Sequence, residues 1–341
     1  MNYPQSNSTD ARAFRFVNQA GVTVNSTEFA KSVLAQAVAA AEPDLARRIG
    51  EEPNWRSGYQ TYFTELAALE FADRNQGFDF ASLALDRLGS QIVDQNKNSL
   101  RSLAQLGFAS RNLVSTFRIK GAGAPQEYWP GGALVDVAAG WVSRGLAEPD
   151  VAKAFDFLAQ NPSLPIASDL LIALAGNAEL AATRDWLSLG GRVAVVARPN
   201  PKAWKSLIEH ARSSAGELLI CVDARHELVS VATDEQLAQV AGLNLVDYVD
   251  LVACWVHELS RTEDRIVLAS YSYVGGSKQI IAQAAQDSII DVASSNIARA
   301  KLALSYLATP LDVVSCRVEL ANKQFAAFDL RSTYEKWRDA I

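Results

Sequence analysis

The amino-acid sequence predicts an α/β protein in which a mainly helical N-terminal region precedes a doubly wound parallel sheet. Up to about residue 162, apolar residues recur mostly at helical spacing. After that point short apolar runs alternate with helical patterns, which is typical of parallel strands joined by crossover helices. We therefore expect a disordered tail over 1–12, a mainly helical region with a short hairpin over 13–162, and an α/β domain over 163–341.

The N-terminal region begins with a polar tail and a predicted hairpin. The first twelve residues, MNYPQSNSTDAR, contain no apolar run. Alternating phenylalanines before the turn NQAG predict two short strands over 14–24. Asn25 and Glu28 have the spacing of a capping box and predict a helix that Pro43 ends. Further helical patterns cover 59–72, 80–94, 133–145 and a segment that starts around Pro149.

The second half of the chain has a β-α-β-α-β pattern from residue 170 onwards. The run 170–175 is continuously apolar, as in a strand that is buried on both faces. Asn177 can cap a helix that Gly190 and Gly191 would end. The remaining expected elements are a strand over 193–197, a helix over 203–214, strands over 217–222 and 265–270 with a helix around 246–259 between them, a long helix from Lys278 and a last strand around 311–318.

Composition and charge exclude several classes of partner. The net charge is −6 and no block of lysine or arginine occurs, so neither nucleic acid nor an anionic membrane is expected as a partner. No run approaches the roughly 18 apolar residues of a membrane span, and the polar start lacks a secretory signal, which predicts a cytoplasmic location. Cys221, Cys254 and Cys316 have apolar neighbours and are expected to be buried thiols. Three separated histidines and no cysteine pair predict no metal site.

The candidate ligand-binding residues follow the predicted strands, because doubly wound sheets bind ligands at the carboxyl ends of their strands. Gly176, Asn177 and Ala178 place backbone amides at a predicted helix start, where the helix dipole favours an anion. Arg198 follows the second strand and suits the 2′-phosphate of NADP, while Asp223 could accept a hydrogen bond from adenine. The alternatives are a solvated arginine and an aspartate that caps the following turn.

The stretch from Ser168 to Arg317 resembles the short-chain dehydrogenase/reductase superfamily. Its runs LLIALAG, GGRVAVVAR and ELLICVD are similar to the first three strands of that family, and LATPLDVVSC is similar to a late strand. The resemblance implies a Rossmann-like fold with NADP as the cofactor. Of the family's glycine pattern only Gly176 is present, and Glu179 would repel a pyrophosphate placed close to it.

The resemblance also implies catalytic residues after the strand RIVLAS. Ser270 or Ser272 would occupy the place of the family's catalytic serine. Tyr271 or Tyr273 could donate a proton to the substrate, and Lys278 could lower the pKa of that phenol. Where the family has its tyrosine and lysine, this chain reads IAQAAQDSII. Aromatic residues beside an apolar strand are, alternatively, core residues.

These residues predict an NADP-linked oxidoreductase that acts on a carbonyl or alcohol of a small organic substrate. The alternative is a non-catalytic Rossmann-like module that binds a nucleotide, a metabolite or a protein partner. Catalysis requires the phenol of Tyr271 or Tyr273 within about 3 Å of a substrate oxygen, so the positions of these two side chains separate the hypotheses. The helical region would serve as a substrate lid or as the surface of a homo-oligomer.

Overall fold

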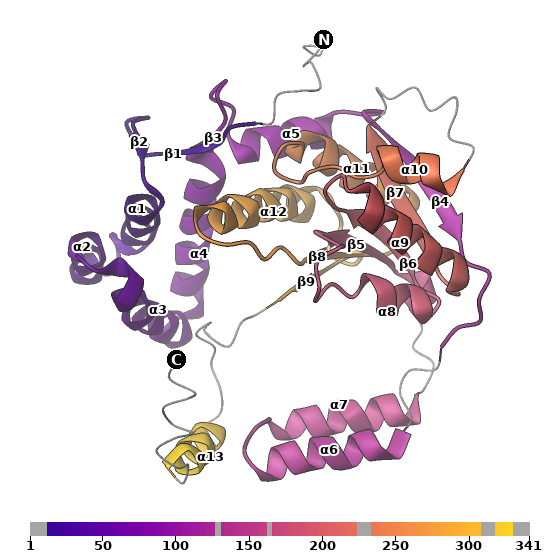
Figure 1. Cartoon of the computed structure of the whole chain (residues 1–341). Helices are drawn as coiled ribbons and strands as arrows, with labels where there is room; N and C mark the ends of the chain where they lie inside the picture. Colours follow the sequence, from indigo (N-terminus) through magenta and orange to yellow (C-terminus); the bar gives the residue numbers. More distant parts are fainter. Residues whose placement is uncertain (1–11, 127–130, 162–165, 224–232, 308–317, 330–341) are drawn as a thin grey trace. The chain divides into compact units, whose positions relative to one another are not determined.

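The computed structural model describes residues 12–126, 131–161, 166–223, 233–307 and 318–329 (Figure 1). The chain divides into two compact units. The first comprises 1–125 and 166–311, and the second comprises 126–165 and 312–341.

The first unit contains a six-stranded, mostly parallel sheet, which confirms the predicted α/β class. Its strands lie in the order β4-β7-β6-β5-β8-β9. All neighbours from β7 to β9 are parallel, whereas β4 is antiparallel to β7. The strands are β4 (Val114–Lys120), β5 (Leu170–Leu174), β6 (Arg192–Val196), β7 (Glu217–Asp223), β8 (Ile266–Ser270) and β9 (Leu302–Tyr306).

The order of the strands places one reversal inside the sheet. The chain builds outward from β5 through β6 to β7 and then returns to the other side of β5 for β8 and β9. At this reversal Leu174 of β5 lies opposite Ser270 of β8, so the carboxyl ends of the two strands are neighbours. Ligands of open α/β sheets bind at such reversals, which makes this edge the expected place of a site.

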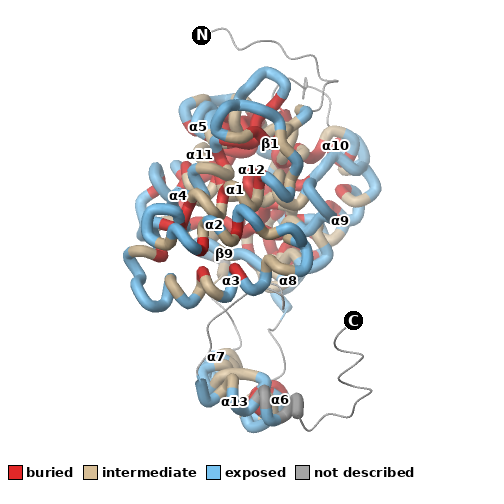
Figure 2. Tube along the Cα trace, turned by 90° about the vertical axis from the view of Figure 1, so that its left-hand side faces the viewer, coloured by how far each residue is buried: buried red, intermediate tan, exposed pale blue. Residues whose placement is uncertain are grey.

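Helices cover both faces of the sheet, as the buried strands require. Leu171 and Ala173 of β5 pack on one face, whereas Leu170, Ile172 and Leu174 pack on the other, because side chains alternate along a strand. The first face is covered by α8 (Thr183–Ser188), α9 (Pro201–Ser213) and α10 (Asp234–Val240). The second is covered by α5 (Leu100–Ala109), α11 (Val249–Thr262) and α12 (Ser277–Asn296). Buried positions, red in Figure 2, run along α11 and α12.

The N-terminal region adds a small sheet and further helices. The predicted hairpin is confirmed, since β1 (Arg15–Val17) pairs antiparallel with β2 (Thr23–Val24). β3 (Ile92–Val93) completes this sheet on the other side of β1. The helices are α1 (Ser26–Val38), α2 (Pro43–Glu51), α3 (Trp55–Ala72) and α4 (Arg74–Ser90). Asn25 caps α1 as predicted, because its side chain accepts a hydrogen bond from the backbone N–H of Glu28.

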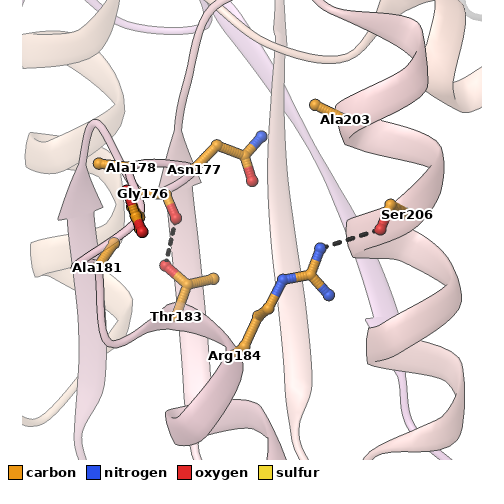
Figure 3. Close-up of a pocket in the computed structure, with 9 residues that line it drawn as sticks. Gly176, Asn177, Ala178, Ala181, Thr183, Arg184, Ala203 and Ser206 are labelled. Carbon is orange, nitrogen blue, oxygen red and sulfur yellow. Dashed lines mark hydrogen bonds between the residues drawn. The ribbon is translucent and has the colours of Figure 1, made fainter.

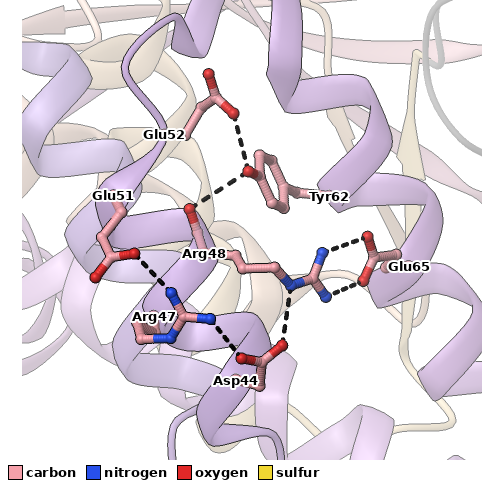
Figure 4. Close-up of polar contacts among 7 residues, drawn as sticks. All are labelled: Asp44, Arg47, Arg48, Glu51, Glu52, Tyr62 and Glu65. Atoms are coloured by element: carbon pink, nitrogen blue, oxygen red, sulfur yellow. Dashed lines mark hydrogen bonds and ion pairs between the residues drawn. The ribbon is translucent and has the colours of Figure 1, made fainter.

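Polar contacts join α2 to α3 (Figure 4). The guanidinium of Arg48 donates to both carboxylate oxygens of Glu65, at 2.9 and 2.5 Å. The hydroxyl of Tyr62 donates to Glu52 at 2.9 Å. A backbone hydrogen bond from Asn54, and secondly the Tyr62 hydroxyl, hold the pKa of Glu52 below its ordinary value. These helices therefore interact through specific polar pairs as well as through a small apolar cluster.

The second unit, in the part that the structure describes, consists of α6 (Gly131–Ser143), α7 (Pro149–Gln160) and α13 (Val318–Asp329). Trp141 of α6 and Phe155 of α7 make an edge-to-face contact with their ring centroids 5.9 Å apart. Gly145 follows α6 with a φ of +71°, a left-handed conformation that favours glycine. None of the helices described in either unit is both long and apolar enough to cross a membrane.

Several predicted elements differ from the structure. The helix predicted to start at Asn177 starts at Thr183. β4 agrees with the strand that the run STFRIK suggested within the mainly helical region, whereas β9 was not predicted. The last strand predicted around 311–318 lies, up to residue 317, outside the described residues. So does the tail, except for Arg12, which donates a 2.9 Å hydrogen bond to Asp250.

Candidate functional site

A pocket of about 240 Å³ lies at the carboxyl ends of β5 and β6 (Figure 3). One side is the turn that follows β5, and the others are α8 and the first two turns of α9. The lining residues are Gly176, Asn177, Ala178, Glu179, Ala181, Thr183, Arg184, Ala203 and Ser206. The three residues predicted after the first strand therefore all line this pocket.

The turn after β5 is held in shape by its own backbone. Ala175 has a φ of +64°, the left-handed region, which turns the chain away from the strand direction. The N–H of Gly176 donates to the carbonyl of Val196 at 3.0 Å, and its carbonyl accepts from the hydroxyl of Thr183 at 2.7 Å. These bonds tie the turn to β6 on one side and to α8 on the other.

The prediction that Asn177 caps a helix is wrong, because the chain forms a turn and not a helix at this position. α8 begins only at Thr183, after a turn over 175–182, and the residue at its N-cap is Ala182. The amides of Gly176, Asn177 and Ala178 are therefore not at a helix N-terminus. The dipole of α8 therefore does not act at these three amides.

Gly176 is required by packing. A Cβ atom at this position would lie 2.9 Å from the Cβ of Ala173 and 3.0 Å from a methyl carbon of Val195. Both distances are shorter than ordinary van der Waals contacts. The glycine lets the turn lie directly on β5 and β6, and this contact accounts for the one glycine that the chain retains here.

Arg184 and Ser206 connect the two helices at the pocket. Nη2 of Arg184 donates to Oγ of Ser206 at 3.1 Å. Nε2 of His210 lies 3.1 Å from the carbonyl oxygen of Arg184 and 3.3 Å from Oγ of Ser188. In Figure 3 the side chains of Asn177 and Arg184 extend toward α9, which carries Ser206. Positive charge and polar groups thus meet in a wall that hydrogen bonds hold in place.

The two other predicted cofactor residues do not line this pocket. Arg198 is exposed just after β6, and its carbonyl accepts a 3.2 Å hydrogen bond from Nε1 of Trp204. Within the described residues its guanidinium has no hydrogen-bond or ion-pair partner. Asp223 is the last residue of β7 and is buried, and the residues that follow it, 224–232, are outside the described part. Their contacts with NADP stay predictions.

Ser270 is buried against α12. It is 4% exposed, and its hydroxyl donates to Oε1 of Gln286 at 2.8 Å. The amide nitrogen of Gln286 in turn contacts the hydroxyl of Ser272 and the carbonyl of Ala282. The predicted catalytic serine therefore belongs to a closed hydrogen-bond network on the face of the sheet opposite to that of Tyr271.

The predicted catalytic tyrosines and lysine are not brought together either. Tyr271 is 6% exposed in the core with Ala173, and burial raises the pKa of its phenol, which a backbone hydrogen bond from Ala182 partly offsets. Tyr273 is 82% exposed, and Lys278 is exposed in the first turn of α12. This arrangement matches the alternative that Tyr271 is a core residue.

Sequence reasoning missed the polar side chains of the pocket that come from helices. Thr183, Arg184 and Ser206 were not singled out, because the helix was expected to start at Asn177 and Arg184 then falls within it. The signal that could have located them is the pair Thr183-Arg184, a hydroxyl and a cation directly after the alanine-rich turn.

In the part of the chain that the structure describes, no group of three or more His, Cys, Asp or Glu side chains could hold a metal ion. Cys221 and Cys254 are buried free thiols as predicted, and burial raises the pKa of Cys254 to about 12; Cys316 lies outside the described residues.

Comparisons with protein-family models, with curated proteins and with solved structures found no match. The resemblance to short-chain dehydrogenases therefore stays a prediction.

Proposed function

We propose that this chain is a Rossmann-like module that binds a nucleotide at the carboxyl edge of its sheet. The observation that carries the proposal is the pocket between the turn after β5 and α9. The order of the parallel strands also supports it, since the first three lie in reverse order on one side and the next two follow on the other. Dinucleotide-binding sheets have this order and bind their ligands at the same edge.

The size of the pocket limits how much of a nucleotide it encloses. At about 240 Å³ it is smaller than the roughly 300–1,000 Å³ of pockets that bury a drug-sized ligand. One part of a nucleotide would therefore enter it. The remainder would lie on the surface toward the ends of β6 and β7, where Arg198 and Asp223 are found.

NADP is the nucleotide that these residues favour. Arg198 is exposed and has no partner in the described part of the chain, so its guanidinium is available to a phosphate. The test is thermal unfolding of the full chain with NADPH, NADP, NADH and NAD, since a ligand that binds only the folded state raises the Tm. A higher Tm with NADPH and NADP supports the proposal. An unchanged Tm with all four ligands refutes nucleotide binding.

NADP-linked oxidation or reduction of a carbonyl or alcohol is a second candidate. It is supported by the open segment between β8 and α12, where a Cβ atom added at Gly275 or Gly276 would have no neighbour within 4 Å. Such a segment could bring Tyr273 and Lys278 to a substrate, while Tyr271 stays in the core. NADPH consumption with a panel of small aldehydes and ketones, lost in Tyr273→Phe, would establish it; no consumption favours the binding module.

A further inference from the structure

The charge of Arg184 is not neutralised by a neighbouring carboxylate. Its only hydrogen-bond acceptor among the described residues is the hydroxyl of Ser206, and no ion pair links it to an acidic side chain in that part of the chain. A guanidinium carries five N–H donors, so most of them are available to a ligand in the pocket. Arginine binds phosphate and carboxylate groups through paired hydrogen bonds, and the pocket therefore has one strong anion-binding group.

The backbone that carries Arg184 is held in place before any ligand binds, while the Arg184 side chain itself is exposed. The contacts of His210 with the Arg184 carbonyl and with Ser188 hold α8 against α9. The buried hydroxyl of Thr183 bonds to Gly176 and fixes the start of α8 on the turn. A ligand would therefore lose little affinity to the ordering of the backbone around the pocket.

The other polar groups of the pocket are suited to hydroxyls. Asn177 can both donate and accept, and Glu179 is an acceptor that repels a phosphate placed beside it. The acidic side chain belongs to the turn and the basic one to α8, so a ligand with an anionic end and a hydroxylated end has a single favourable orientation. Glu179, which opposes a pyrophosphate, thus fits the hydroxyls of a sugar.

We infer that Arg184 and Ser206 bind the phosphate of a phosphorylated sugar whose hydroxyls contact Asn177 and Glu179. The inference rests on the proposed function, since it names the part of the nucleotide that enters the pocket. It assigns the phosphate in the pocket to Arg184, a residue of α8, and leaves Arg198 outside. The ligand class is a pentose phosphate, free or as part of a nucleotide.

The experiment is calorimetric titration of the full chain with ribose 5-phosphate and with ribose. We expect ribose 5-phosphate to bind and ribose to bind much more weakly, because the charged hydrogen bonds come from the phosphate. Arg184→Ala should weaken ribose 5-phosphate binding by about tenfold or more, which is the usual effect of removing hydrogen bonds to a charged group. Lys205→Ala is the matched control, since it removes a positive charge from α9 outside the pocket.

A second variant tests the pocket without removing the charge. Ala203→Leu adds side-chain volume to the α9 wall and should also weaken binding, with circular dichroism and Tm confirming that the variant is folded. Absence of ribose 5-phosphate binding to the unchanged chain overturns the inference. So does full binding by either pocket variant, or a loss of binding in Arg198→Ala that exceeds the loss in Arg184→Ala.

The outcomes separate this inference from the proposed function. If NADPH raises the Tm of the unchanged chain and of Arg184→Ala equally, nucleotide binding stands and the Arg184 subsite is wrong. If ribose 5-phosphate binds through Arg184 while no nucleotide shifts the Tm, the subsite stands and the ligand is a sugar phosphate alone.

Discussion

Gly176 lies where the turn after β5 comes closest to the sheet. Gly176→Ala places a Cβ atom 2.9 Å from that of Ala173, so β5 or the turn must shift. Overpacking of this kind typically costs about 1–3 kcal/mol of the free energy of unfolding. Urea denaturation measures the difference, and an unchanged midpoint would show that the turn moves away freely.

Ala175, the neighbour of Gly176 in the same turn, provides the control substitution for that experiment. Its φ of +64° is strained for a residue with a Cβ atom, so Ala175→Gly removes strain while making the unfolded chain more flexible. The two effects are of similar size, about 1 kcal/mol each, and the free energy of unfolding should stay level or rise slightly. A loss comparable to that of Gly176→Ala would mean that any substitution in this turn is harmful.

Asp287 of α12 is a partly buried carboxyl group whose ionisation opposes folding. Burial is the main cause that raises its pKa above the ordinary 3.8, and the hydrogen bond from Gln283 only partly offsets it. Above pH 3.8 the unfolded chain loses this proton more readily than the folded chain, so stability falls as the pH rises through the folded-state pKa.

Asp287→Asn should therefore stabilise the protein at neutral pH and have little effect below pH 3.8. The asparagine keeps the acceptor oxygen that Gln283 contacts. Urea unfolding of both proteins at about pH 3.5 and pH 7 gives the comparison. Equal stability at neutral pH would contradict the argument.

At the scale of elements, ion pairs connect the beginnings of β6 and β7 to the end of α11. Arg192 donates to both carboxylate oxygens of Glu263, at 2.6 and 2.7 Å, and to Glu217 at 3.1 Å. The hydrogen bond from Arg192 is the main reason that the pKa of Glu263 lies below its ordinary value. Ion pairs thus stabilise the amino ends of β6 and β7, at the end of the sheet opposite the pocket.

Arg192→Ala should destabilise the protein by about 2 kcal/mol or more at pH 7, because it leaves the buried carboxylate of Glu263 without its main partner. Because the pKa of Glu263 is lowered in the folded state, the contribution is present above pH 4.5 and is lost as the pH falls through the folded value. The variant and the unchanged protein should therefore converge in acid. A gap that does not shrink as the pH is lowered below 4.5 would assign the effect to lost packing.

The sequence predicted most elements by periodicity and missed those that depend on distant partners. The buried runs of β5, β6, β7 and β8 were recognised, because strands covered on both faces are continuously apolar. The run STFRIK already suggested the strand β4, which forms a full ladder with β7, whereas β9 was missed. The start of α8 was misplaced because Ala175 and Thr183 shape the turn through contacts that no helical spacing reveals. The candidate pocket lies at the strand end that the sequence indicated, but the arginine and hydroxyl side chains of its helical wall were not predicted.

At the scale of the molecule, the N-terminal helices and the sheet share one core. Phe16, Phe29 and Phe108 pack in the same buried cluster as Leu170 and Ile172 of β5. The helices α5 and α4 lie against α11 and α12, so the first unit does not separate at residue 162 into a helical part and a sheet part.

A chain shortened to residues 166–341 should therefore fail to fold cooperatively. It would expose the apolar face of α11 and leave β7 without β4. Near-ultraviolet circular dichroism and the heat of unfolding measure the loss, and the full-length chain is the control. A sharp thermal transition in the shortened chain would show that the sheet folds independently of the N-terminal helices.

The pairing of β4 with β7 also has a consequence for how the protein is made. Val114 pairs with Asp223, so β4 leaves the ribosome long before its partner exists. At about 5–20 residues per second, the roughly 100 intervening residues take about 5–20 s to synthesise. During that interval β4 has no ladder and is open to pairing with other nascent chains. Translation speed and chaperone capture over this interval thus become determinants of how much protein reaches the native state.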